Sequence, residues 1–408
     1  MDSFEKLTLV ARACDHEADG EISAHQNGIS YRRDQAALDN PTSRMDSSKV
    51  RMRKTRRKAD DIPIHNAVGP HGRPFPLLKS MLTTVCEMDC YYCAFRSGRD
   101  IKRVTFRPEE LAQVFYDVHQ SGAVEGLFLS TGIFSGGANT QNRLLDTAEI
   151  LRRRIGFQGY LHLKIMPGAE QGQVLRAMQL ADRVSVNLEA PNASRLASLA
   201  PHKKFAEQLL VPFQWMEEIR QNHSPSQTWH GRWPSSTTQF VVGPAGENDL
   251  ELLATVASLT RSPGFARAYF EAFNPVPGTP LENHRPEDPW RQHRLYQASF
   301  LLRDYGFDLE ELPFTQQGNL PIEKDPKETY AERTYRRVPL EVNKADRSEL
   351  LRIPGIGPRG ANAILNARRE RTLSDLSQLR KLGILAERAA PYIVLNGRQP
   401  LKQLNLFS

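Results

Sequence analysis

The stretch Thr84-Val85-Cys86-Glu87-Met88-Asp89-Cys90-Tyr91-Tyr92-Cys93 contains three of the four cysteines of this 408-residue chain, far from Cys14. So few cysteines do not make a disulfide framework. In a reducing compartment, thiols grouped this closely more often bind a metal or carry out redox chemistry than form a structural disulfide. The spacing therefore predicts a metal centre at Cys86, Cys90 and Cys93.

The number of thiols indicates which metal centre this is. Three thiolates can hold three irons of a 4Fe–4S cluster and leave the fourth iron open to another ligand. Structural zinc is the alternative, but it normally takes four ligands, often as two C-x2-C pairs. Only Cys14 or a histidine could complete such a site here, so the sequence favours one 4Fe–4S cluster.

Outward from the cysteines, apolar β-branched runs alternate with amphipathic stretches. We expect strands at Leu77–Thr84, Gly126–Thr131, Tyr160–Ile165, Arg183–Glu189, Thr237–Gly243 and Arg267–Phe273. Helices are expected near 108–121, 141–155, 170–181, 205–222, 248–261 and 289–305. Six successive βα units predict an α/β fold, a partial (βα)6 TIM-like barrel, with the cysteines at its carboxyl edge. A doubly wound sheet is the alternative, which periodicity does not separate from a barrel.

Composition and pattern divide the chain into four segments. Residues 1–62 read as a short helix and a flexible arm, and residues 63–310 as the βα core. A polar, proline-containing linker is expected at 311–338, followed by a small all-α domain at 339–397. The arm ends in the cations Lys49, Arg51, Arg53, Lys54, Arg56, Arg57 and Lys58. Such a run of cations is usually a solvated, flexible segment, and the more specific alternative is that it contacts nucleic acid.

The all-α segment contains the stretch Ile353-Pro354-Gly355-Ile356-Gly357-Pro358-Arg359-Gly360 between apolar residues at helical spacing. It predicts two helices joined by a tight turn, in which glycines adopt angles that other residues avoid. The second helix begins beside exposed N–H groups, which attract phosphate oxygens without reading bases. We therefore expect nucleic-acid contacts at Gly355, Ile356, Gly357, Arg359 and Gly360, with a protein-contact module as the alternative.

Composition sets looser limits. Hydrophobic residues make up 39% and charged residues 25%, as in an ordinary globular protein. The net charge of +7 hints at a polyanionic partner. No apolar run reaches the length of a membrane span, and Met1 to Arg12 lack the apolar core of a secretion signal. We expect a cytoplasmic protein without membrane contact.

The cysteine loop resembles the C-x3-C-x-Φ-C motif of the radical S-adenosylmethionine (SAM) superfamily, with Tyr92 at the aromatic position. The resemblance implies that SAM chelates the open iron and that one electron cleaves it to a 5′-deoxyadenosyl radical. In this family the aromatic residue lies near the SAM adenine. Further cofactor contacts are implied at strand ends by Ser130, Thr131, Gly132, Lys164, Asn187 and Glu189. The alternative for each is a buried polar group satisfied inside the barrel.

Over most of its length the chain resembles a family of bacterial radical SAM proteins assigned to DNA modification or repair. Matching stretches include Gly126–Ser130, Tyr160–Lys164, Ser185–Glu189 and Phe273–Pro277, and the C-terminal segment resembles helix-hairpin-helix modules. The resemblance implies a DNA substrate, a partner resembling uracil-DNA glycosylase, and an electron donor of the reductase or flavodoxin type. Two alternatives are an RNA-modifying enzyme and a non-catalytic iron–sulfur protein that binds DNA or senses redox state.

Overall fold

The computed structural model describes residues 1–14, 62–68 and 74–400, so the basic arm at 49–58 lies outside the described residues. The chain divides into two compact units. Unit 1 comprises Met1–Ala245 and Ser262–Arg285, and unit 2 comprises Gly246–Arg261 and Pro286–Ser408. In the described part of the chain, no helix has the length and apolar character needed to cross a membrane.

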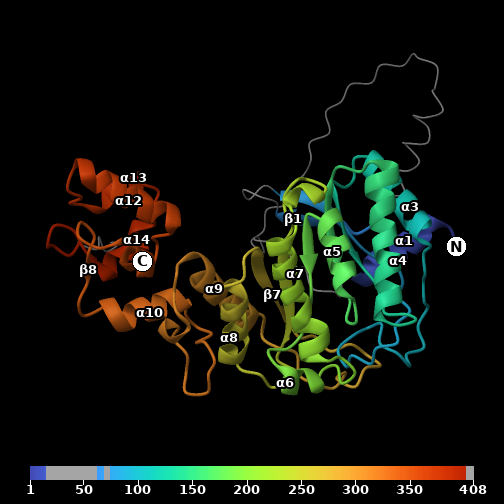
Figure 1. Ribbon diagram of the computed structural model, residues 1–408. Coiled ribbons are helices and arrows are strands. Elements are labelled where there is room, and N and C mark those ends of the chain that lie inside the picture. The colour runs from blue at the N-terminus through green and yellow to red at the C-terminus, as the bar shows by residue number, and fades with distance from the viewer. Residues whose placement is uncertain (15–61, 69–73, 401–408) are drawn as a thin grey trace, which may run out of the picture. The chain divides into compact units, whose positions relative to one another are not determined.

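Unit 1 is built on a sheet of seven strands (Figure 1). The strands are β1 (His65–Val68), β2 (Pro74–Met81), β3 (Gly126–Ser130), β4 (Tyr160–Lys164), β5 (Arg183–Ser185), β6 (Ser235–Val242) and β7 (Phe265–Ala272). They pair in unbroken order from β1 to β7, and all pairs are parallel except β1 with β2. A doubly wound sheet would reverse its strand order at one point, whereas consecutive order is that of a barrel wall. The predicted α/β fold with a partial barrel is confirmed, and β1 is an additional strand.

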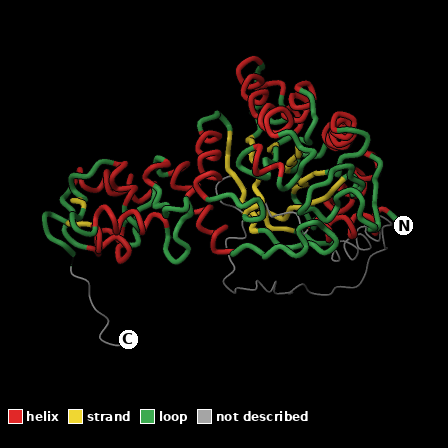
Figure 2. Tube along the Cα trace, turned by 90° about the horizontal axis from the view of Figure 1, so that it is seen from below, coloured by secondary structure: helices red, strands yellow, loops and turns green. Residues whose placement is uncertain are grey.

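Helices of unit 1 cover one side of this sheet. They are α3 (Pro108–Gln120), α4 (Gly137–Glu149), α5 (Gln171–Leu180), α6 (Ala193–Ala197) and α7 (Val211–Asn222), with π-helical turns at Ile150–Ile155 and Phe205–Leu210. Helices α3, α4, α5 and α7 contact one another in that order and lie together in both views (Figures 1 and 2). Their apolar faces are buried, as Leu111, Phe115 and Val118 of α3 illustrate. The other face of the curved sheet is therefore free to carry polar side chains.

The N-terminal helix α1 (Ser3–Cys14) also belongs to unit 1. Leu7, Val10 and Ala11 are buried, and α1 contacts β2 and α3. Lys6 on α1 pairs with Glu110 on α3 at 2.8 Å. The N-terminal helix expected from the sequence is thus fixed to the sheet by its apolar face and to α3 by an ion pair.

Unit 2 is mainly helical. Its helices are α8 (Asp249–Thr260), α9 (Pro289–Asp304), α10 (Pro326–Tyr335), α11 (Arg347–Arg352), α12 (Pro358–Glu370), α13 (Leu376–Lys381) and α14 (Ala386–Ala389), and a small parallel pair joins β8 (Leu340–Glu341) to β9 (Ile393–Val394). The segment expected as a linker, 311–338, contains α10, whose Ala331 is buried in the same core cluster as Leu350, Ile356 and Ile364. This segment is therefore part of the folded unit.

Two short helix pairs of unit 2 meet at their turns. Gly355, between α11 and α12, has a φ of +83°, and its carbonyl accepts a 3.2 Å hydrogen bond from the N–H of Leu385, between α13 and α14. A Cβ atom at Gly355 would lie 2.4 Å from the Leu385 carbonyl oxygen. This close approach explains why glycine is required at the turn.

Candidate functional site

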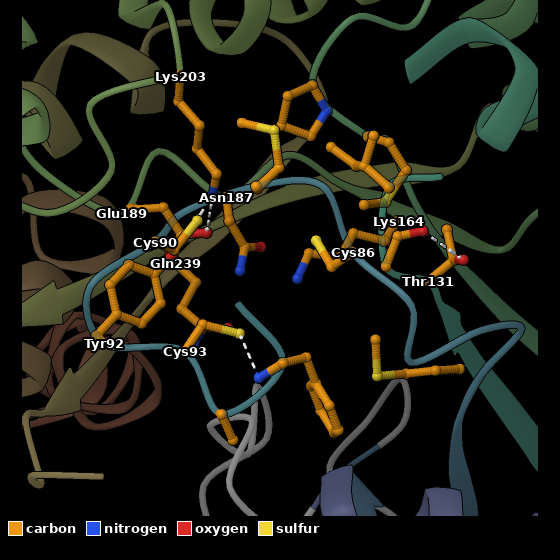
Figure 3. Close-up of a pocket in the computed structure, with 18 of the residues that line it drawn as sticks. Cys86, Cys90, Tyr92, Cys93, Thr131, Lys164, Asn187, Glu189, Lys203 and Gln239 are labelled. Atoms are coloured by element: carbon orange, nitrogen blue, oxygen red, sulfur yellow. Dashed lines mark hydrogen bonds and ion pairs between the residues drawn. The ribbon is translucent and has the colours of Figure 1, made fainter. Parts of the chain in front are cut away.

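The three clustered cysteines lie in the loop that follows β2, at the carboxyl edge of the parallel strands. The loop begins in register with the sheet, since the N–H of Leu82 donates to the Ser130 carbonyl at 2.9 Å. Cys90 is buried, and Cys86 and Cys93 are half-buried. All three line one pocket (Figure 3). Cys93 Sγ also accepts a 3.4 Å hydrogen bond from the N–H of Phe95.

Arg103 holds this loop from its far end. Its guanidinium donates to the carbonyl oxygens of Thr84 at 2.6 Å, Phe95 at 2.8 Å and Arg96 at 2.9 Å. These carbonyls lie on either side of the three cysteines in the sequence. One planar side chain therefore ties the start of the loop to its end, with charge-assisted bonds that are stronger than neutral ones.

Gly132 allows the end of β3 to pack against the start of the cysteine loop. Its N–H donates to the Thr83 carbonyl at 2.7 Å. A Cβ atom at this position would lie 2.2 Å from the Val85 carbonyl oxygen, which no side chain tolerates. The residue predicted as a SAM contact thus also sets the distance between two strand ends.

The pocket gathers polar residues from strands β4, β6 and β7 and from the segments that directly follow β3 and β5. Most of the cofactor contacts expected from the sequence lie in it together with the cysteines, namely Tyr92, Thr131, Gly132, Lys164, Asn187 and Glu189. Gln239 of β6 and Glu271 of β7 complete the ring and are hydrogen-bonded to each other at 3.1 Å. Ser130 is buried at the end of β3 and does not line this pocket. The roles of these residues stay predictions, but the fold brings them to one place.

Strand β5 ends earlier than the sequence pattern predicts. The expected strand runs to Glu189, whereas β5 ends at Ser185, and Asn187 and Glu189 lie beyond it. Glu189 has a φ of +64°, in the left-handed region that non-glycine residues rarely adopt. Its backbone is fixed there because its N–H donates to Gln239 and its carbonyl accepts from Val241, at 2.9 and 2.8 Å.

A lysine that the sequence reasoning missed lies beside these residues. Lys203 Nζ is 3.0 Å from Glu189 Oε1 and donates to the Tyr92 hydroxyl at 3.3 Å. Burial alone would raise the pKa of Glu189, but the charges of Lys203 and Lys164 outweigh it and hold that pKa below its ordinary value. Burial raises the pKa of Cys90, and Lys203 opposes that rise. No local motif marks Lys203, because it follows α6 rather than a strand end.

The sheet face beneath the pocket carries three basic residue types in one row. Lys79, His162 and Arg183 occupy one row of the strand register. Lys79 and His162 lie two residues before Met81 and Lys164, which line the pocket. Burial, followed by the charges of Arg183, Lys164 and Lys79, holds the pKa of His162 well below its ordinary value. His162 is therefore neutral at pH 7 and lies against the ring of Phe128, with the ring centroids 4.6 Å apart.

A second cavity, of about 640 Å³, adjoins the first and shares Tyr92, Phe95 and Glu271 with it. Its wall includes Val10 of α1 and residues 273–277 after β7. Arg99 lines this second cavity and donates to the carbonyl of Pro277 at 2.5 Å and to that of Ala94. The cysteine loop therefore contributes to the walls of both cavities.

The donor set fits an iron–sulfur cluster better than a single ion. Among the described residues, no three His, Cys, Asp or Glu side chains converge on a point where one metal ion would bind. A 4Fe–4S cluster takes one thiolate for each ligated iron, so its ligands are spread around a larger group. Three thiols on one loop, with polar side chains facing them, fit a cluster with three protein ligands.

In unit 2, the predicted nucleic-acid contacts have mixed environments. Arg359 is exposed on the first turn of α12, whereas Ile356 is buried in the core. Gly360 lies against Ile384 of the second helix pair. Arg368 donates to the carbonyls of Val342 at 2.9 Å and Ala345 at 2.6 Å. Its guanidinium therefore stabilises the fold of unit 2.

No protein-family model and no curated protein sequence matches the chain. Similar solved structures include the FeFe-hydrogenase maturase HydG from Carboxydothermus hydrogenoformans, with 14% identity, a TM-score of 0.44, and coverage of 56% of this chain and 51% of that one. Methylornithine synthase (PylB) has 15% identity and a TM-score of 0.44, over 64% of this chain and 70% of that one. The radical SAM methyltransferase TsrM from Kitasatospora setae, with cobalamin and a [4Fe–4S] cluster bound, has 12% identity and a TM-score of 0.39, over 51% and 39%. The chain spans about half the length of HydG, and these likenesses are too low to carry an argument about function.

Proposed function

We propose that this chain is a radical SAM enzyme. The observation that carries the proposal is the placement of Cys86, Cys90 and Cys93, in C-x3-C-x-Tyr-C spacing, around one pocket at the carboxyl edge of a consecutive parallel sheet. Such edges are where βα folds place their active sites. When bound, a three-thiolate 4Fe–4S cluster supplies an open iron for SAM and the electron that cleaves it to a 5′-deoxyadenosyl radical.

Residues that line the pocket supply groups to bind SAM and an apolar lining to shield the reaction from water. Lys164 offers a cation to a carboxylate, and the Asn187 amide offers a donor and an acceptor to hydroxyl groups. Met81, Phe128 and Met166 give the pocket an apolar lining, which keeps water from a reactive species. Binding, orientation and exclusion of water are thus provided at one place.

The test of this activity begins with anaerobically reconstituted protein. Iron per chain is measured first, and 5′-deoxyadenosine is then measured after addition of SAM and dithionite. We expect about four irons per chain, and loss of both iron and product in Cys90→Ser. Cys14→Ser is the matched control and should keep both. A Cys90→Ser chain that still cleaves SAM would overturn the proposal.

As the substrate we propose DNA, which the C-terminal helix pair supports. The turn Pro354–Gly357 leads directly into α12, whose first N–H groups have no acceptor within the helix and favour a phosphate. Arg359 adds an exposed cation there, and the chain as a whole carries a net charge of +7. A base in duplex DNA would have to be flipped out, or be single-stranded, to enter a pocket.

Salt dependence and competition test the DNA substrate. Affinity for a fluorescent DNA duplex is measured at rising salt, and we expect it to fall steadily as phosphate contacts are lost. Arg359→Ala should bind more weakly and with a smaller salt dependence, whereas Arg333→Ala, an exposed arginine on α10, serves as the control. If matched RNA competes better than DNA, the substrate is RNA instead. If neither binds, the nucleic-acid proposal fails.

The proposal also includes two partners. Because each cleavage of SAM consumes one electron, a reductase or flavodoxin-type donor is needed for turnover. A protein resembling uracil-DNA glycosylase is the second, and it rests on the family resemblance alone. Pull-down of each from the same cell extract, with the cluster intact, tests them separately.

A further inference from the structure

Lys203 and Glu189 form a buried ion pair inside the cysteine pocket. Their side chains are only 9% and 5% exposed, and the Nζ–Oε1 distance is 3.0 Å. Lys203 also bonds the hydroxyl of Tyr92, which lies between Cys90 and Cys93 in the motif. Figure 3 shows Lys203 extending into the pocket toward Glu189, next to Cys90 and Tyr92. A buried pair is costly to form, because both charges leave water, so its position calls for an explanation.

The surrounding backbone fixes both partners. Glu189 is held at a φ of +64° by its hydrogen bonds to β6, and such strain persists only where the surrounding structure imposes it. The segment that carries Lys203 is joined to the cysteine loop, since the N–H of Tyr91 donates to the Leu199 carbonyl at 2.7 Å. The lysine therefore keeps its place relative to the thiols.

The charge of Lys203 acts on the thiols as well as on Glu189. Burial alone would lower the pKa of Lys203, but negative charge on Cys90 and Glu189 raises it well above its ordinary value. Paired with the Glu189 carboxylate at 3.0 Å, Lys203 places a cation in the pocket that the three thiols line. The Glu189 carboxylate offsets part of the positive charge of Lys203 and fixes the position of its ammonium group.

We propose that Lys203 is a positioning residue that fixes Tyr92 and whose charge raises the reduction potential of the cluster. The inference rests on the proposed function, since it requires the cluster to be bound. A cluster held by three thiolates becomes more negative when it accepts an electron, and a nearby buried cation stabilises that added charge. In this proposal Glu189 positions Lys203 and does not contact SAM. The family resemblance, in contrast, implies a SAM contact for Glu189.

The test is the cluster's midpoint potential, followed by electron paramagnetic resonance in a dithionite titration. Glu189→Gln removes the offsetting carboxylate and should shift the potential upward from that of the unaltered chain. Adding Lys203→Met to Glu189→Gln removes the isolated cation and should shift the potential back down. Adding Lys204→Met instead is the matched control, since Lys204 is the exposed neighbouring residue and its loss should leave the potential unchanged.

Each result decides between the alternatives. Equal effects of Lys203→Met and Lys204→Met, in chains with full iron content, would overturn the role of Lys203 and leave the proposed function intact. A chain of unaltered sequence that takes up no iron would overturn the proposed function itself. The double variant with Lys203→Met could lose the cluster, and the Glu189→Gln single variant then serves as the test. If the cluster in that single variant has the same midpoint potential as in the unaltered chain, the inference is contradicted.

Discussion

Gly132 is a residue whose small size is required by a close contact in the site. A Cβ atom there would lie 2.2 Å from the Val85 carbonyl oxygen, directly before Cys86. Gly132→Ala should therefore lower the free energy of unfolding by about 1–3 kcal/mol, as overpacking does. Urea unfolding measures the change. Gly172→Ala on α5, where the added atom meets nothing within 4 Å, should be neutral or stabilising by up to about 1 kcal/mol. Equal effects of the two changes would contradict this explanation.

Lys327 makes the stability of unit 2 depend on pH. Its Nζ is buried and donates to the Ile356 carbonyl at 2.6 Å. Burial lowers the pKa of Lys327 from 10.5 to about 7. Between these values the unfolded chain binds a proton that the folded chain has lost, so this lysine makes the free energy of unfolding rise with pH. The rise is at most about 1.4 kcal/mol per pH unit, and below pH 7 the contribution is at its lowest.

Replacement of this lysine tests the effect. Urea unfolding at pH 7 and pH 9 should show a larger gain in stability for the unaltered chain than for Lys327→Met, which has no proton to lose. Lys324→Met, at a half-exposed position nearby on the surface, is the control and should keep the gain. The same gain in the Lys327→Met chain would mean that other groups carry the pH dependence.

Among the elements, the cysteine loop depends on Arg103. Its three short bonds to carbonyls of the loop are charge-assisted, and each such bond is worth about 1.5–3 kcal/mol. Arg103→Ala should therefore make the loop open at least about tenfold more often. Hydrogen exchange at the amides of residues 84–97 measures this, with exposed Lys102→Ala as the control. Unchanged exchange in Arg103→Ala would show that the sheet alone holds the loop.

The helices and parallel strands could be predicted from the sequence because their apolar periodicity follows from burial on one face. β5 could not be bounded this way, since Val186 and Leu188 continue the apolar pattern while the backbone turns toward Glu189. The four-residue strand β1 is too short to show a period. Helix α10 had an available signal, because Asp325 caps it and Pro326 occupies its first turn. The cluster-binding thiols could be predicted from their spacing in the sequence. Lys203 could not, because only the tertiary structure brings it into the site.

At the scale of the whole molecule, unit 2 is larger than the helical domain expected at 339–397. Glu311 pairs with Arg352 at 2.5 Å, and α10 contributes Lys327 and Ala331 to the core around the helix pairs. A fragment of residues 305–400 should therefore melt above a fragment of residues 339–400 by at least about 4–8 °C, the shift that 1 kcal/mol produces in a small domain. Circular dichroism measures both transitions. Equal melting temperatures would place the boundary of the unit near residue 339.

The interleaving of the two units has a consequence for synthesis of the chain. Helix α8 belongs to unit 2 but is made before β7 of unit 1. The buried Asp249 on α8 pairs with Arg291 and accepts from the N–H of Leu320, which follow it by 42 and 71 residues. At about 5–20 residues per second, the ribosome takes roughly 4–14 seconds to deliver both partners. During that interval a nascent chain carries an apolar helix face and a carboxylate without their native contacts, which is the kind of surface that chaperones bind.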